Sequence, residues 1–145
     1  MTQVRRATDA DIPTLVEMGQ RFISETPYHD QLAFDPEQAE HFGRWLLTYE
    51  KGLIVVLDID GATRGMLGAI TIVHPFSSAV VASELFWWVE PEARGAGIRL
   101  LREFQRWGRS MGASALNMVA PNERVAHVYE RLGFGLIESM YGRAV

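Results

Sequence analysis

The chain has 145 residues, 48% of them hydrophobic and 22% charged, which is typical of one globular domain with a sizeable core. Its net charge of −4 argues against nucleic-acid binding, which normally needs a basic surplus, and the absence of cysteine excludes a disulfide framework, a thiolate metal site and a cysteine nucleophile. Because no apolar run approaches the length of a membrane span and residues 1–6 lack the apolar stretch of a secretory signal, we expect a cytoplasmic protein without a membrane partner.

The first part of the chain predicts a short strand near residues 3–7 and then two amphipathic helices. Thr8 or Asp9 can cap the first helix, whose apolar positions recur at helical spacing over residues 12–23. After a loop, Asp35 is a typical cap residue for the second helix, because a proline follows it at the first helical position.

The hydrophobic period then changes and indicates three consecutive strands. They cover residues 53–57, 65–73 and roughly 80–89, with an Asp60-Gly61 turn between the first two. Since the connections are too short for a parallel crossover, we expect an antiparallel meander.

The remaining elements are a helix over about 97–111, a strand over 114–119, a helix over 122–132 and a last strand beginning at Phe134. A strand–helix–strand sequence implies parallel pairing with a right-handed crossover. The predicted order is β-α-α-β-β-β-α-β-α-β. This is an α/β (α+β) fold, with a mixed, mainly antiparallel sheet and helices on both faces, and we expect residues 1–145 to form a single domain.

A glycine-rich loop joins the third strand of the meander to the following helix. It reads Arg94-Gly95-Ala96-Gly97-Ile98-Arg99. Glycines let backbone N–H groups approach a ligand closely, and the start of a helix attracts an anion such as phosphate. The loop by itself predicts either a phosphate site or a plain tight turn.

A second motif lies about one strand further along the chain. It reads Asn122-Glu123-Arg124-Val125-Ala126-His127-Val128-Tyr129-Glu130-Arg131-Leu132-Gly133-Phe134. In this order the two motifs resemble the GNAT superfamily of acetyl-CoA-dependent N-acetyltransferases over essentially the whole chain, and its short bacterial and bacteriophage-encoded members most. Arg94 and Gly97 match the first and fourth positions of the family's phosphate loop, R/Q-x-x-G-x-G/A, whereas Arg99 replaces its last small residue.

The resemblance implies that the chain transfers an acetyl group from acetyl-CoA to a primary amine by direct attack in a ternary complex, without a metal. The sheet would open between strands 80–89 and 114–119 to admit the pantetheine arm. Backbone groups of Trp87, Trp88 and Val89 would pair with that arm, and one N–H would polarise the acetyl oxygen. We expect the two tryptophan side chains themselves to be core or rim aromatics.

The resemblance also assigns residues to the phosphates of the cofactor. They are Arg94, Gly95, Ala96, Gly97, Ile98 and Arg99, and Asn122 would be a further contact to the cofactor. Asn122 would cap its helix as well, and the side chain of Arg99 would point outward and leave its N–H free. On this view Gly97→Val abolishes cofactor binding and leaves the fold largely intact, because the new side chain stands where phosphate oxygens approach.

Tyr129 corresponds to the family tyrosine that protonates the departing thiolate. A phenol suits this role because it stays protonated near neutral pH. Helical periodicity alone would favour a packing role for the ring instead. Under the acid hypothesis, Tyr129→Phe slows turnover and changes stability little.

Glu84 is the candidate general base. If the strand alternates without interruption, Glu84 shares a face with Phe86 and Trp88, and desolvation raises its pKa towards a useful value. The alternative is a strand-end carboxylate in water. His74, His127 and a chain of water molecules are weaker candidates.

The acceptor would be bounded by residues 25–34 and the turn at 74–78. Acidic Glu25 and Asp30 could attract an amine, although loop carboxylates are usually only solvated. A small amine, an amino acid, an antibiotic and a peptide or protein N-terminus all stay open. Four arginines also recur at helical spacing and predict a solvated helix face, or a contact to the 3′-phosphate as the minority interpretation; they are Arg99, Arg102, Arg106 and Arg109.

Two other protein classes compete with the enzyme. One is a CoA-binding module of the same fold that has lost catalysis, which the departure at Arg99 suggests. The other is a different nucleotide-phosphate binder, which ranks low because no G-x-x-x-x-G-K-[ST] pattern is present. The final strand seen in longer family members is either missing or supplied by a partner, so a homodimer is possible.

Overall fold

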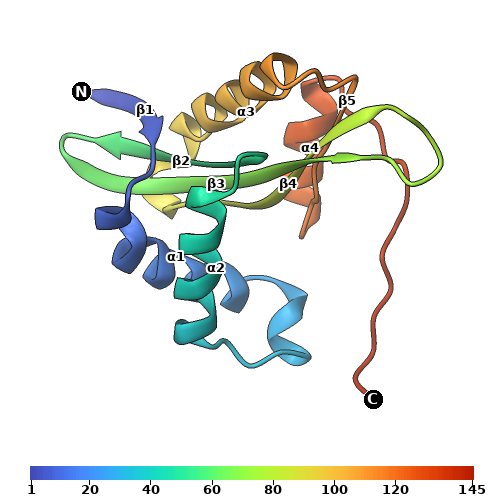
Figure 1. The fold of residues 1–145 in the computed structure, drawn as a ribbon. Coiled ribbons are helices and arrows are strands. Elements are labelled where there is room, and N and C mark those ends of the chain that lie inside the picture. The colour runs from blue at the N-terminus through green and yellow to red at the C-terminus, as the bar shows by residue number, and fades with distance from the viewer.

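The computed structural model describes residues 1–145 as a five-stranded sheet in the order β1-β2-β3-β4-β5, with helices on both faces (Figure 1). The strands are β1 (Thr2–Arg6), β2 (Gly52–Ile59), β3 (Ala62–Val73), β4 (Val80–Val89) and β5 (Ala115–Asn117). The helices are α1 (Ile12–Ser24), α2 (Pro36–Thr48), α3 (Ile98–Ser110) and α4 (Glu123–Arg131), with 3₁₀ turns at Asp9–Asp11, Pro27–Asp30 and Pro91–Ala96. None of the helices is long and apolar enough to cross a bilayer. The predicted fold class is confirmed.

Strands β2 to β4 form the predicted antiparallel meander, with one parallel strand, β5, added beside β4. β1 pairs antiparallel with β2 at the other edge, which the sequence did not specify. The Asp60-Gly61 turn has positive φ at both residues, 51° and 82°, which is the backbone conformation of a tight hairpin turn. β5 pairs with β4 only over Val81–Ser83, so the rest of β4 has a free edge on that side.

Side chains cap two of the helices, α2 and α4, as their sequences predict. The carboxylate of Asp35 accepts hydrogen bonds from the first turn of α2, and the Asn122 side chain accepts one from Val125 N–H at 3.0 Å in α4. Thr8 and Asp11 form a capping box in the turn before α1. These bonds satisfy N–H groups that the helices themselves leave unpaired.

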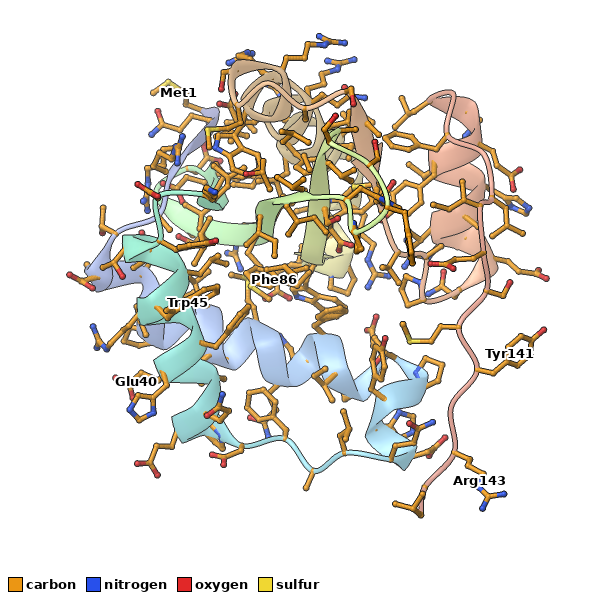
Figure 2. All side chains as sticks on the ribbon, turned by 45° about the vertical axis from the view of Figure 1, so that its right-hand side comes forward. Met1, Glu40, Trp45, Phe86, Tyr141 and Arg143 are labelled. Carbon is orange, nitrogen blue, oxygen red and sulfur yellow. The ribbon has the colours of Figure 1, made fainter.

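Each face of the sheet carries its own hydrophobic core. α1 and α2 cover one face, where Met18, Leu46 and Trp88 are buried, and α3 and α4 cover the other, where Phe104 and Tyr129 are buried (Figure 1). Figure 2 shows Phe86 between the sheet and α1, and its ring meets that of Phe42 edge-on at 6.3 Å. The central strands are therefore buried on both sides.

A β-bulge at Leu85 breaks the alternation of β4. Gly68 pairs with Phe86 but its neighbour Ala69 pairs with Glu84, so Leu85 has no partner in β3. The extra residue shifts the side-chain alternation by one position. Glu84 consequently faces the α3–α4 side, away from Phe86 and Trp88, and the prediction that these three share a face is wrong.

The last predicted strand does not form. Residues 135–145 have no regular structure, and they run from the end of α4 past the turn at Pro27–Asp30 (Figures 1 and 2). The Tyr28 hydroxyl contacts the Met140 sulfur at 3.8 Å on this path. The segment buries little apolar surface, since Leu136 is 86% and Ile137 76% exposed.

Candidate active site

A cleft of about 300 Å³ opens at the C-terminal end of β4, in the part of the sheet where β5 no longer pairs with it. The end of α1 forms one wall and α4 forms the opposite wall. Fifteen residues line it: Phe22, Glu25, Thr26, Trp87, Trp88, Val89, Arg94, Gly95, Ile98, Pro121, Asn122, Arg124, Val125, Val128 and Arg131. The cleft thus brings together the two sequence motifs and the end of the first helix.

The glycine-rich loop forms the floor between β4 and α3. The 3₁₀ turn Pro91–Ala96 precedes and overlaps its first three residues, Arg94–Ala96, and Gly97 N–H then donates to the Arg94 carbonyl at 3.1 Å. Gly95 lies in the cleft wall, and a Cβ placed there would meet nothing within 4 Å. Backbone at Gly95 is therefore open to a ligand, as phosphate binding requires.

Gly97 differs from Gly95 because it does not line the cleft. It is buried, and a Cβ there would lie 2.7 Å from a methyl carbon of Val89 and 3.2 Å from the Arg94 carbonyl oxygen. The missing side chain would point into the protein, so Gly97 is required for packing of the loop on β4. The expectation that Gly97→Val leaves the fold largely intact is wrong.

Arginine side chains approach the cleft from three places. Arg94 comes from the loop, and Arg124 and Arg131 come from α4. Arg99 is exposed and lies outside the cleft lining, in agreement with an outward side chain. Sequence reasoning missed the two α4 arginines, although Arg124 lies only two residues after the helix cap Asn122.

The remaining arginines of the α3 stripe are also exposed and outside this cleft. Their positions agree with a solvated helix face. The candidate bases His74 and His127 are exposed too, and neither lines the cleft. His74 lies in the hairpin turn, where its Nδ1 accepts a hydrogen bond from the Phe76 N–H at 3.1 Å.

Trp87 and Trp88 point to opposite faces of the sheet at the inner end of the cleft. Trp87 stacks on the ring of Tyr129 with centroids 5.7 Å apart, whereas Trp88 belongs to the core under α1 and α2. The indole N–H groups of both are buried and have no hydrogen-bond partner. Buried donors without partners are rare in proteins and favour a bound group that supplies acceptors.

Glu84 and Tyr129 meet at one peptide segment beyond the end of β5. The Glu84 carboxylate accepts a hydrogen bond from Val119 N–H at 3.2 Å, and the Tyr129 hydroxyl donates to the Val119 carbonyl at 3.0 Å. Ser83 is the last residue of β4 whose backbone pairs with β5. One residue further on, the link between β4 and the chain after β5 is made by the Glu84 side chain instead. Both predicted catalytic residues are therefore linked through Val119, which sequence reasoning did not single out.

Burial changes the acid–base properties of this pair. Glu84 is 7% exposed, and desolvation raises the pKa of its carboxyl to about 7, against the opposing effect of the hydrogen bond from Val119. Burial and the nearby Glu84 charge raise the pKa of the Tyr129 hydroxyl well above its usual range. Near neutral pH the phenol therefore stays protonated, and the carboxyl can change its protonation state.

The pair lies behind the cleft surface, and neither Glu84 nor Tyr129 lines the cleft directly. The Trp87 ring, which does line it, stacks on Tyr129. No group of three or more histidine, aspartate or glutamate side chains is arranged to hold a metal ion. The site thus combines an open glycine, arginine side chains, unpaired buried indole N–H groups and the buried pair Glu84 and Tyr129.

The fold is a single mixed sheet between two helical layers, with a cleft where β4 and β5 stop pairing, and the comparison with protein families makes its class specific. The model of the acetyltransferase (GNAT) family matches residues 17–134. The chain belongs to the GNAT acetyltransferase family. No curated protein sequence matches it significantly.

Solved structures share the fold at low sequence identity. A transcriptional regulator from Bacillus halodurans C-125 matches with a TM-score of 0.82 and 16% identity, covering 100% of both chains. A predicted acetyltransferase from Clostridium acetobutylicum, solved with acetyl-CoA, has a TM-score of 0.82 and 17% identity over 99% of this chain and 96% of the other. An aminoglycoside 6′-N-acetyltransferase from Acinetobacter baumannii has a TM-score of 0.79 and 16% identity over 100% of this chain and 98% of the other.

Proposed function

We propose that the chain transfers the acetyl group of acetyl-CoA to a primary amine by direct attack in a ternary complex. The observation that carries this proposal is the position of the phosphate loop and of the Glu84–Val119–Tyr129 connection at the same gap between β4 and β5. Family membership and the acetyl-CoA complex of a neighbour with the same fold support it.

The cleft residues fit a cofactor that carries phosphates. Arg94, Arg124 and Arg131 would neutralise its negative charge, and Gly95 would let backbone N–H groups approach it. The indole N–H groups of Trp87 and Trp88 lack partners, although both nitrogens are buried in this structure. Asn122 holds the N-terminus of α4 at the cleft wall.

Acetyl-CoA supplies an activated acetyl group and a thiolate leaving group. Glu84 would take the proton that the acceptor amine loses, directly or through a water molecule, because its raised pKa of about 7 suits proton exchange near neutrality. Tyr129 would deliver a proton from its hydroxyl to the departing sulfur. Val119 holds both side chains in place through its two backbone groups.

The wider proposal is a cytoplasmic enzyme whose single N-acetyltransferase domain covers residues 1–145 and acts without a metal, nucleic acid or membrane. Its acceptor is a small-molecule or peptide amine. The aminoglycoside acetyltransferase among the structures with this fold makes a small polyamine a reasonable first acceptor to test. A homodimer belongs to the same proposal and is tested by sedimentation.

The experiment is calorimetric titration with acetyl-CoA, CoA and ATP, followed by a thiol-release assay against a panel of amines. We expect binding of both CoA species, no comparable binding of ATP, and thiol release that depends on the amine. Arg124→Gln should weaken CoA binding by about tenfold, the effect of losing one charge-assisted contact. Arg99→Gln is the matched control, because that arginine lies outside the cleft, and equal losses in both variants would contradict the proposed site.

A CoA-binding module without catalysis is the alternative function. The observation that favours it is the burial of Glu84 and Tyr129 behind the cleft surface, where both are already hydrogen-bonded to Val119. Tight CoA binding without thiol release for any amine would support the module and contradict the enzyme.

A further inference from the structure

The side chain of Arg94 is held by three groups that each attract a cation. Its Nη2 lies 2.9 Å from the Glu25 carboxylate, and its Nε donates to the Val89 carbonyl at 3.3 Å. The central guanidinium carbon stands 5.3 Å from the centroid of the Trp88 ring, which is a cation–π distance. The guanidinium therefore occupies a small cation-binding position on the α1 side of the cleft.

The fold would make this position electronegative without Arg94. Glu25 is the C-cap residue of α1, so its carboxylate is at the negative end of the helix dipole. The face of the Trp88 ring is negative as well, because of its π electrons. Carboxylate, helix end and ring all favour a positive charge between them, and Arg94 supplies it.

Arg94 cannot keep all of these contacts while its guanidinium also binds phosphate. It is the first residue of the phosphate loop, and a pyrophosphate in the cleft would compete with Glu25 for its N–H groups. The ion pair is accessible enough to exchange, since the Arg94 and Glu25 side chains are 31% and 47% exposed. An exposed ion pair of this kind contributes little to stability, so little is lost when the guanidinium exchanges partners.

We propose that Glu25, the Trp88 ring and the C-terminal end of α1 form an acceptor subsite for a positively charged group, which Arg94 fills until the phosphates of the cofactor draw it away. The inference rests on the proposed function and adds the class of acceptor. The reacting amine must be neutral to attack, so the group bound here is a second cation. Acceptors are therefore diamines, polyamines or other molecules with two positive centres, and they bind after the cofactor.

The first test measures CoA binding by calorimetry in Glu25→Gln. Removing the competing carboxylate should tighten CoA binding by about two- to fivefold, which corresponds to the free energy of an exposed ion pair. Glu92→Gln is the control, because it changes the net charge equally but removes a carboxylate that faces Arg64, outside the cleft. Unchanged CoA affinity in Glu25→Gln, or equal tightening in both variants, would overturn the exchange.

The second test needs no cofactor. Arg94→Gln empties the subsite, so it should bind 1,4-diaminobutane measurably more tightly than the wild-type chain does, and more tightly than it binds 1-aminobutane. The double variant Arg94→Gln, Glu25→Gln should lose this binding, with circular dichroism confirming that both variants are folded. Equal binding of the diamine by the single and double variants would overturn the subsite.

The two tests separate the failure of this inference from that of the proposed function. A wild-type chain that does not bind CoA would refute the proposed function and the exchange step together, whereas the diamine titration would still decide the subsite. Conversely, an active enzyme that uses monoamines and diamines equally well in both wild type and Glu25→Gln would leave the acetyltransferase intact and refute the subsite.

Discussion

Glu84 illustrates how one inserted residue changes the chemistry available to a side chain. The sequence leaves two environments open for Glu84, a desolvated carboxyl with a raised pKa and a strand-end carboxylate in water; in the structure the carboxyl is buried, and this desolvation raises its pKa. The sequence does not reveal the bulge at Leu85, because bulges depend on how two strands pair and any residue type can occupy them. The bulge turns Glu84 towards Tyr129 and separates it from Phe86, so the acid and base candidates share one side of the sheet.

The raised pKa of Glu84 predicts an unusual dependence of stability on pH. The folded state binds the proton more tightly than the unfolded chain, so the free energy of unfolding should fall as pH rises from about 4.5 to about 7. The full loss is about 3 kcal/mol for a shift of this size. Glu84→Gln removes this titrating group. In urea unfolding, the free energy of unfolding of the variant minus that of the wild type should therefore be larger at pH 8 than at pH 5.

The same variant tests the role of Glu84 as a base. In the wild type, kcat/KM for a working amine should rise with pH through about 7, as the carboxylate form becomes populated. In Glu84→Gln, kcat/KM should no longer rise with pH in this range, and most of the activity should be lost. Glu92→Gln is the exposed control, and parallel pH profiles in the wild type and Glu84→Gln would show that another group takes the proton.

Tyr129→Phe separates proton donation from packing. It keeps the ring that stacks on Trp87 but removes the part-buried hydrogen bond to the Val119 carbonyl, so we expect a loss of about 1 kcal/mol in stability, more than the sequence suggests. If Tyr129 protonates the thiolate, kcat should fall roughly 10²–10⁴-fold while CoA affinity stays nearly constant. Wild-type turnover in this variant would leave Tyr129 as a packing residue.

The loop between β4 and α3 divides its two functions between two glycines. Gly95→Val should weaken CoA binding and leave the melting temperature nearly unchanged, because its side chain would enter open space in the cleft wall. Gly97→Val should lower the melting temperature markedly, because its Cβ would overlap with Val89. Calorimetry and thermal unfolding of the two variants check this, and a reversed pattern would contradict the assignment of the two glycines.

Helices and strands with strong local signals were predictable from the sequence. Asp35 and Asn122 show why, since each cap residue marks a helix start through its own hydrogen bonds. The edge strand was predicted longer than it is: residues 114–119 were expected, and Ala115–Asn117 form it. Its length depends on where β4 diverges, which is a tertiary property that no local pattern records.

In the whole molecule, the final strand and the composition of the cleft were the least predictable features. Residues from Phe134 onward have apolar side chains suited to a strand, but a strand also needs a partner edge, and β5 contributes only three residues to pairing. The cleft joins α1 to α4, which are about 100 positions apart in the sequence. Glu25, Arg124 and Arg131 meet only in the folded chain, so their combination could not be read from either motif.

The short pairing of β5 has a consequence for backbone amide exchange. Amides of β4 that face β3 are bonded within the sheet and should exchange with solvent deuterium only when the sheet opens. Beyond Ser83 the opposite edge of β4 has no strand to bond, so N–H groups that face the gap should exchange quickly in the free protein. A single strand is then expected to show alternating slow and fast amides, and a ligand lying along the gap should slow the fast ones selectively.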